Sequence, residues 1–376
     1  MALTVRPISS ISDKKKFIRL LWDIYEGDAN WVPPLMMDRL KLIDEKKNPF
    51  YKHSDTQWFI AEDGGKVVGR IGAIVNRAHN EAHNEKAGFF GFFESINDPA
   101  VARALFNAAE SWLKSKGMTK VIGPENPSMN DETGLLVEGF DRPPVMLMTY
   151  NPRYYQALIE QNGYTKTKDL YAWLLSQQTS RSPKLERVVE YMRNRHKITV
   201  RASDPKQFTS DVAIIKNIYN SAWERNWGFV PMNDAEFDFL AADLKQVYDP
   251  ALVLFAEIEG KTAGFALSLP DINQAFLAGP KIPSGMLNLP IGLYNLLTKK
   301  KSIDTVRILV LGVLKEFRGR GIDALLYWET MERAKKHGYN FGEASWVLED
   351  NVQMNRAAEM MQGEKYKTYR IYEKQL

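Results

Sequence analysis

Two arginines and two glycines stand between an apolar run and a helix-like segment in the last quarter of the sequence. The apolar run, residues 306–313, is rich in β-branched side chains, which is typical of a strand buried on both faces. Residues 318–321 (Arg-Gly-Arg-Gly) follow, and apolar side chains recur at helical spacing from Ile322. A strand, a glycine-rich turn and a helix together point bare N–H groups at an anion, and arginine suits phosphate oxygens. The pattern indicates phosphate binding, although a solvated turn would have the same composition.

These residues resemble the pyrophosphate loop of the GNAT superfamily of acyl-CoA N-acyltransferases, which has the form Arg/Gln-x-x-Gly-x-Gly/Ala. Arg318 and Gly321 match the first two defined places, and Asp323 departs from the third. The run 343–351 resembles the next strand of that family and ends at Asn351, where the family has an asparagine that contacts pantetheine. Residues 359–376 resemble its closing helix and strand. The resemblance implies an α/β fold with a mixed, mostly antiparallel central sheet flanked by helices.

The first half of the chain recurs in the second half in the same order. Thr-Val-Arg at residues 4–6 returns at 199–201, and Asn-Trp-Val-Pro at 30–33 has a counterpart at 226–231. Two hairpin patterns follow, and Gly69 in the first matches Gly264 in the second. Such ordered matches predict a tandem duplication. We therefore expect two tandem GNAT-like domains, residues 1–177 and 198–376, joined by a linker and a connecting helix at 178–197.

The two copies differ where the phosphate loop should be. In place of the glycine-rich turn, the first copy has residues 95–99, Ser-Ile-Asn-Asp-Pro. Asp98 followed by Pro99 is a favourable N-cap and first helical residue. The Asp98 carboxylate would accept the free helix N–H groups itself and would repel a diphosphate. We expect the first copy to be degenerate and acyl-CoA to bind the second copy.

The resemblance places acyl-CoA or acetyl-CoA in a gap between the strands at 306–313 and 343–348. Pantetheine would contact strand backbone, and the diphosphate would meet the turn and the helix start. No metal is expected in the site. The residues expected to contact the co-substrate are Leu311, Gly312, Val313, Arg318, Gly319, Arg320, Gly321, Ile322 and Asn351.

Acyl transfer to an amine needs a base for the amine and an acid for the departing thiolate. Alternation along the second strand puts Glu343 on the same face as Val347. Glu343 and Glu349, just beyond that strand, are candidate bases, and each is equally well explained as a surface or salt-bridged carboxylate. The family often has an acidic tyrosine seven residues after the asparagine, but that position is Ala358. Tyr366 is the candidate acid if the last strand turns it inward.

Composition restricts the function further. The 376 residues include 50 Lys and Arg, 46 Asp and Glu and no Cys, giving a net charge of +4. No basic block predicts nucleic-acid binding, and the absence of cysteine excludes disulfides, cysteine metal ligands and cysteine nucleophiles. No signal-like segment or membrane-spanning run is evident, so we expect a cytoplasmic protein. His79 and His83 have the spacing of metal ligands on a helix, but their polar, repetitive surroundings predict a loop.

An apolar segment broken by prolines, residues 271–303, occurs only in the second copy and contains three consecutive lysines near its end. It suggests a long-chain donor or an amphiphilic acceptor and a peripheral contact with a membrane surface. Packing between the two domains would explain the same residues.

We predict an N-acyltransferase that moves an acyl group from acyl-CoA to a small-molecule or amphiphilic amine bound in the cleft between the copies. Asp323 and Ala358 leave an alternative, a catalytically silent protein that binds acyl-CoA or another ligand. A third interpretation, a transferase that uses aminoacyl-tRNA, requires more cationic character than the net charge of +4 provides.

Overall fold

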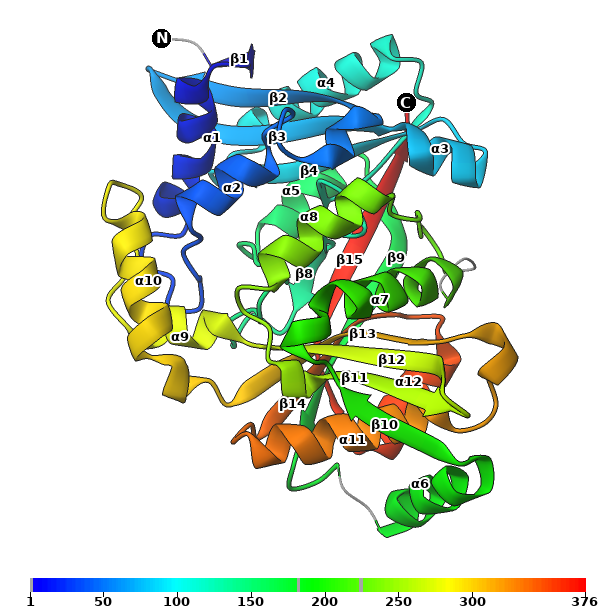
Figure 1. Cartoon of the computed structure of the whole chain (residues 1–376). Coiled ribbons are helices and arrows are strands. Elements are labelled where there is room, and N and C mark those ends of the chain that lie inside the picture. The colour runs from blue at the N-terminus through cyan, green and yellow to red at the C-terminus, as the bar shows by residue number, and fades with distance from the viewer. Residues whose placement is uncertain (1–2, 181–182, 223–225) are drawn as a thin grey trace. The chain divides into compact units, whose positions relative to one another are not determined.

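The computed structural model describes residues 3–180, 183–222 and 226–376 (Figure 1). The chain forms two compact units that are interleaved along the sequence. Unit 1 comprises Met1–Leu170, Ala275–Lys300 and Lys367–Leu376, and unit 2 comprises Tyr171–Gln274 and Lys301–Tyr366. The domain boundaries expected from the sequence stay a prediction.

The sheet of unit 1 has the strand order β1-β2-β3-β4-β5-β15. Neighbouring strands are antiparallel except β4 and β5, which are parallel. The short β8 also pairs with β15, and β6 and β7 form a separate ribbon. The strands are β1 (Thr4–Ile8), β2 (Ser54–Asp63), β3 (Lys66–Asn76), β4 (Ala87–Ser95), β5 (Lys120–Gly123), β6 (Glu125–Asn126), β7 (Glu132–Thr133), β8 (Leu135–Glu138) and β15 (Glu364–Gln375).

Helix α4 packs on this sheet through an apolar face that includes Leu105 and Leu113, both without exposed surface. Asp98 caps the helix by accepting from Ala100 N–H (2.7 Å), and Pro99 is its first residue, as predicted. The helices of unit 1 are α1 (Ile11–Ile24), α2 (Met36–Leu42), α3 (Arg77–His83), α4 (Pro99–Ser115), α5 (Tyr155–Gln161) and α10 (Asn288–Thr298), with α9 (Ile272–Ala278) at the unit boundary.

The loop predicted around His79 and His83 is wrong, because these residues belong to helix α3. Asn76 caps the helix by accepting from His79 N–H (3.2 Å). The His79 ring is buried and meets Phe89 edge-on at 4.8 Å. Tertiary packing therefore stabilises a helix whose polar composition alone favours a loop.

The sheet of unit 2 repeats that of unit 1, with the order β10-β11-β12-β13-β14. Again only the last pair, β13 and β14, is parallel. Gly264 pairs with Val313, as Gly69 pairs with Ser95 in unit 1. The strands are β10 (Ile198–Ala202), β11 (Val253–Ile258), β12 (Lys261–Pro270), β13 (Thr305–Val313) and β14 (Phe341–Leu348), with β9 (Thr165–Ser176) beside β14. The tandem duplication and the α/β fold class are confirmed.

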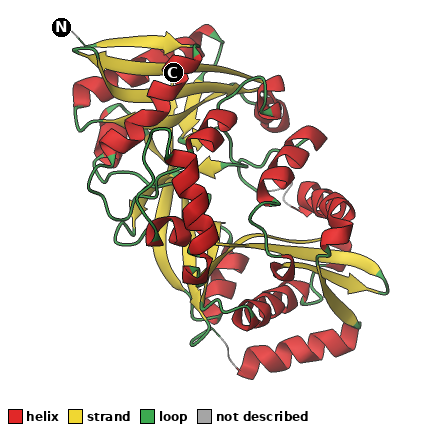
Figure 2. Ribbon diagram, turned by 60° about the vertical axis from the view of Figure 1, so that its left-hand side comes forward, coloured by secondary structure: helices red, strands yellow, loops and turns green. Residues whose placement is uncertain are grey.

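Helices lie against the strands in each unit (Figure 2). In unit 2, α11 covers a core formed with β11, β12 and the paired part of β13 and β14. The connecting helix expected near residues 184–195 is α6, which contacts α11. The helices are α6 (Pro183–His196), α7 (Phe208–Ala222), α8 (Asp234–Leu244), α11 (Ile322–Lys336) and α12 (Val352–Met360), and one-turn 3-10 helices lie at Pro49–Lys52, Pro205–Gln207, Pro250–Leu252, Lys300–Ser302 and Lys315–Phe317.

The apolar segment at 271–303 forms α9 and α10, and most of it packs within unit 1. A side chain at Gly292 on α10 would meet Leu35 at 2.3 Å, and Trp22 donates its indole N–H to the carbonyl of Ile282 (2.9 Å). Within residues 3–180, 183–222 and 226–376, no helix is both long enough and apolar enough to cross a bilayer.

Candidate active site

Strands β13 and β14 run side by side for only part of their length. Their parallel ladder begins at Thr305 with Phe341 and ends at Ile308 with Ala344. At the same point β13 has a bulge against β12, where Leu267 pairs with Val310 and Ser268 with Ile308. Within the part of the chain that the structure describes, the remainder of β13 therefore has no ladder partner on the side of β14, and this edge is open.

The backbone direction on that edge follows from one hydrogen bond. Leu314 N–H donates to the carbonyl of Ala263 (2.9 Å), so Leu314 faces β12. Alternate residues of an antiparallel strand face the same neighbour, which puts Gly312 toward β12 and directs the N–H groups of Leu311 and Val313 to the open edge. Two backbone donors thus line the gap that the sequence assigned to pantetheine.

The glycine-rich turn connects this edge to the start of α11. Gly321 is the N-cap residue of α11 in the left-handed conformation (φ 74°), and as a glycine it has no side chain with which to cap the helix. Gly319 also has positive φ (77°), and a Cβ added there would meet nothing within 4 Å. Arg318 donates from Nε to the carbonyl of Val313 (3.3 Å), which holds its guanidinium beside the β13 edge. The helix N–H groups and the guanidinium are donors that an anionic diphosphate requires, and the open turn leaves room for it to approach them.

Two features oppose an anion at this turn. Asp323 in the first turn of α11 contributes a negative charge: burial raises the pKa of Tyr327, and the charge of Asp323 raises it further. Met192 of α6 lies against Gly321, because a Cβ added to Gly321 would be 2.8 Å from the Cγ of Met192. The turn is therefore open at Gly319 and partly covered at Gly321.

Asn351 lies at the N-terminus of α12, directly after the turn that follows β14. Its side-chain oxygen accepts from Met354 N–H (3.2 Å) and caps the helix. With the oxygen used in this way, the side-chain NH2 group is the part of Asn351 that can donate to a ligand. Ala358, further along α12, is buried at 2% exposure in the core beneath α11.

Two of the three predicted catalytic residues meet. Tyr366, at the unit 2 end of β15, donates its hydroxyl to the carboxylate of Glu343 on β14. Glu343 has no exposed surface, whereas Tyr366 is half-buried. A buried carboxylate that accepts from a more exposed phenol forms a short path for a proton. The third residue, Glu349, lies apart from this pair in the turn between β14 and α12.

Sequence reasoning missed Arg307, which is register partner to Glu343 across the β13–β14 ladder. Its guanidinium is 2% exposed and donates to Ser345, to the hydroxyl (3.1 Å) and to the carbonyl (3.3 Å). Because Ile308 and Ala344 face the core under α11, Arg307 and Glu343 lie on the opposite face of the sheet. An arginine inside the apolar run at 306–313 was the sequence signal for this polar cluster.

The alternation predicted along β14 does not persist to its end. Ala344 and Val347 are three positions apart, yet both belong to the core under α11. Strict alternation would have put Val347 with Glu343 instead. The strand therefore changes the direction of its side chains across Ser345 and Trp346.

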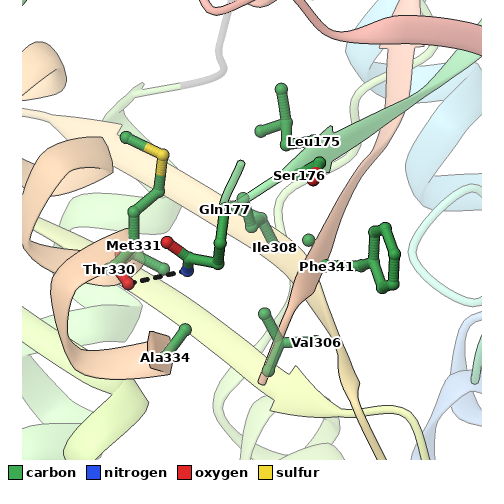
Figure 3. Close-up of a pocket in the computed structure, with 10 residues that line it drawn as sticks. Leu175, Ser176, Gln177, Val306, Ile308, Thr330, Met331, Ala334 and Phe341 are labelled. Atoms are coloured by element: carbon green, nitrogen blue, oxygen red, sulfur yellow. Dashed lines mark hydrogen bonds between the residues drawn. The ribbon is translucent and has the colours of Figure 1, made fainter. Parts of the chain in front are cut away.

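A small, largely apolar pocket lies at the paired end of the same two strands (Figure 3). Val306 and Gly342, which are register partners, form part of its wall. Gln177 crosses it and donates to the carbonyl of Met331 on α11 (2.8 Å). This pocket is distinct from the open end of the strands, where the backbone donors and the glycine turn lie.

In unit 1, other parts of the protein lie against the equivalent edge of β4. Phe92 N–H on β4 donates to the side-chain oxygen of Asn126 (2.6 Å). Ser95, at the register position of Val313, donates its N–H to the hydroxyl of Tyr155 (2.9 Å). A Cβ at Gly91 would lie 1.7 Å from the carbonyl oxygen of Glu125, so β6 lies directly against β4. The first copy thus offers side chains where the second copy offers open backbone.

Glu94 follows on the same strand, and its carboxylate is enclosed in unit 1. Tyr25 and Tyr155 donate their hydroxyls to it (3.0 and 2.7 Å), and Arg70 lies at 3.4 Å. Burial is the largest effect on Glu94 and raises its pKa above the ordinary range, against the lowering effect of Arg70. This network joins the end of α1 to β3, β4 and α5 and gives the first copy a polar core at this position.

In unit 2 the fourth and fifth strands are parallel and diverge beside a helix that begins at a glycine. The same sheet order occurs in unit 1. These features define a tandem GNAT-type acyltransferase fold. The model of the acetyltransferase (GNAT) family matches residues 212–363. The chain belongs to this family.

Relatives match over the whole chain. Bacterial ceramide synthase of Caulobacter vibrioides (strain NA1000 / CB15N) is 39% identical over 381 residues, covering 100% of this chain and 98% of the relative. Protein YghO of Escherichia coli (strain K12) is 37% identical over 379 residues, covering 99% and 95%.

Solved structures share the fold. A tandem GNAT protein from the clavulanic acid biosynthesis pathway aligns with a TM-score of 0.58 at 11% identity, covering 100% of this chain and 98% of that one. A GCN5-related N-acetyltransferase from Sphaerobacter thermophilus aligns with a TM-score of 0.53 at 13% identity, covering 99% and 95%.

Proposed function

We propose that this protein is an N-acyltransferase that moves an acyl group from acyl-CoA or acetyl-CoA to an amine. The observation that carries the proposal is the open edge of β13, which leads directly into the uncapped N-terminus of α11 with Arg318 between them. Acyl-CoA supplies an acyl group activated as a thioester. Family membership supports this class of reaction, and the roles of individual residues are our assignment.

The donor groups fit the co-substrate in order along the chain. Backbone groups of Leu311, Gly312 and Val313 would hold the pantetheine arm, with the N–H of Leu311 or Val313 available to a thioester oxygen. The side-chain NH2 group of Asn351 would add a donor. The turn would hold the diphosphate through Arg318, Gly319, Arg320, Gly321 and Ile322.

We assign proton transfer to Glu343 and Tyr366. The Glu343 carboxylate, which has no exposed surface, accepts the proton that the amine loses through the Tyr366 hydroxyl, to which it is hydrogen-bonded. Tyr366 returns a proton to the thiolate as the C–S bond breaks and the C–N bond forms. Glu349 is the alternative base.

The acceptor is proposed from the relatives. The name ceramide synthase, carried by the Caulobacter relative, favours a lipid-related amine. The expectations that this amine enters between the two copies, that residues 271–303 contact a membrane, and that the protein is cytoplasmic are part of the proposal.

Calorimetric titration with acetyl-CoA and with a long-chain acyl-CoA tests the proposal. We expect heat of binding with at least one of them and thiol release when long-chain amines are added. Absence of binding to either compound would refute acyl-CoA dependence. Binding without thiol release would support the catalytically silent alternative, which Asp323, Met192 at Gly321 and the buried Ala358 favour.

A further inference from the structure

Helix α10 has its polar side inward and its apolar side outward. The inward positions are Asn288, which is 3% exposed, Asn295, which is 0% exposed, and Gly292, which is also buried. Asn288 accepts from Met36 N–H (2.7 Å) and donates to the carbonyl of Pro34 (3.1 Å). These contacts fix the helix to the segment that precedes α2, so its attachment to unit 1 depends on amide groups.

The outward side carries large apolar residues that remain exposed. With 100° between successive helical residues, Leu293, Tyr294 and Leu297 lie roughly opposite the inward asparagines. Met37 on the neighbouring α2 is also exposed, at 57%. In a helix that only completes a soluble core, these faces would be reversed. The exposed residues are Met286 (97%), Leu287 (61%), Leu293 (45%), Tyr294 (51%) and Leu297 (80%).

The charge of the segment indicates what covers this face. Residues 272–303 contain no aspartate or glutamate and four lysines, Lys281, Lys299, Lys300 and Lys301. Lys281 and Lys300, which flank α10 in sequence, are exposed. A leucine-rich face with one tyrosine and lysines at its margin matches the interface of an anionic bilayer, where leucine enters the acyl boundary and lysine meets phosphate.

We propose that α10 docks this protein on an anionic lipid bilayer through the face formed by Met286, Leu287, Leu293, Tyr294 and Leu297. A second copy of the chain is a poorer occupant, because a two-fold contact would bring equivalent lysines together without acidic partners in the segment. The docking face is argued from exposure and charge alone. The inference rests on the proposed function only for the reason to dock, since amphiphilic substrates reside in bilayers.

Vesicle sedimentation of the full chain tests the docking without requiring turnover. Wild-type protein should sediment with vesicles of phosphatidylcholine and phosphatidylglycerol, and more weakly with phosphatidylcholine alone. The double variant Leu293→Glu/Leu297→Glu should lose at least tenfold in affinity for the mixed vesicles. Lys281→Gln/Lys300→Gln should lose roughly 30-fold on mixed vesicles, about fivefold per lysine, and little on neutral ones.

Met360→Glu is the matched control. Met360 lies on α12 at 73% exposure, comparable with Leu297, and outside the docking face. It should bind vesicles like wild type. All of these positions are exposed, so circular dichroism and thermal midpoints should be unchanged, which separates lost docking from lost folding.

The proposal is overturned if wild-type protein ignores both vesicles, or if the leucine variant binds as well as wild type. It is also overturned if wild type is a dimer that Leu293→Glu/Leu297→Glu converts to a monomer, since the face would then be a self-association surface. Calorimetry with acyl-CoA in vesicle-free buffer reports separately on the proposed enzyme function. Vesicle binding without acyl-CoA binding would refute only the latter.

Discussion

Glu343 is the fully buried member of a pair whose other member, Tyr366, retains exposed surface. The phenol is thus placed to connect a concealed carboxylate with a reacting group. Arg307, beside Glu343 in the ladder, brings a positive charge to the same face of the sheet. Burying charged side chains in a core costs folding free energy unless they are hydrogen-bonded. Here the Arg307 guanidinium donates to Ser345.

Replacing Tyr366 with Phe should lower the rate of acyl transfer about 100-fold, the usual effect of losing a general acid–base group. Binding of acyl-CoA, measured by calorimetry, should be unchanged, because we assign the diphosphate to the turn at Arg318 and the Tyr366 hydroxyl, which donates to Glu343, to proton transfer. Tyr191→Phe on α6, where the hydroxyl is exposed, serves as the control. A Tyr366→Phe enzyme with wild-type turnover would remove this residue from the mechanism.

Glu125 in unit 1 gives a pH-dependence with a definite sign. Burial, with repulsion from Asp131, raises the pKa of Glu125 from 4.5 to about 8. The folded state therefore keeps a proton that the unfolded state loses, and the free energy of unfolding falls as pH rises from about 4.5 to about 8. Glu125→Gln should remove this slope and become progressively more stable than wild type as the pH increases. Urea titrations across that range measure it, and parallel curves for both proteins would contradict the raised pKa.

At the scale of elements, the equivalent helices α4 and α11 begin in opposite ways. Asp98 caps α4 with a carboxylate, while Gly321 begins α11 with no side chain at all. One start consumes helix N–H groups within the protein, and the other presents them outward. The same position in two copies of one fold has therefore acquired a structural task in one and a proposed binding task in the other.

Paired substitutions separate these tasks. Asp98→Ala should cost about 1 kcal/mol of unfolding free energy and leave acyl-CoA affinity unchanged. Arg318→Ala should weaken acyl-CoA binding about tenfold or more and leave stability unchanged, because Arg318 is exposed. Denaturant unfolding and calorimetry on both variants provide the comparison. If Asp98→Ala weakened binding as strongly as Arg318→Ala, the assignment of the site to the second copy would be wrong.

Elements with clear periodicity could be predicted from the sequence. The hairpins that contain Gly69 and Gly264, the Asp98 cap and the connecting helix all follow from local patterns. Helix α3 could not, because His79 gains its place by packing on Phe89. The Glu343–Tyr366 contact required the path of the last strand, which residue spacing does not encode. Arg307 is visible in the sequence as a charge within an apolar strand pattern, but its neighbours on β14 are set by the strand register, which residue spacing does not encode.

At the scale of the molecule, the end of the chain belongs to unit 1. Residues Lys367–Leu376 lie in that unit, and Tyr372 to Gln375 pair with β5. Tyr369, Ile371 and Tyr372 have no exposed surface. The tail that resembles the closing strand of the second copy thus contributes its side chains to the core of the first.

Removing residues 367–376 should therefore destabilise unit 1. Without β15, the amides of β5 should lose their protection from hydrogen exchange. In the full chain, Ile371→Ala should cost about 2–5 kcal/mol through the cavity it leaves. Glu373→Ala, at a partly exposed position of the same strand, is the control. Normal protection of β5 in the truncated chain would show that the strand is dispensable.

The place of β15 in the sheet also sets an order of events during synthesis. A ribosome releases the chain from its N-terminus, so β1 to β5 emerge long before their last partner. Until β15 has emerged, β5 presents an unpaired edge that other nascent chains could join. Unit 1 is therefore completed only after β15 has been made, and a stop codon directly before residue 367 would remove a strand partner of unit 1 rather than any residue of unit 2.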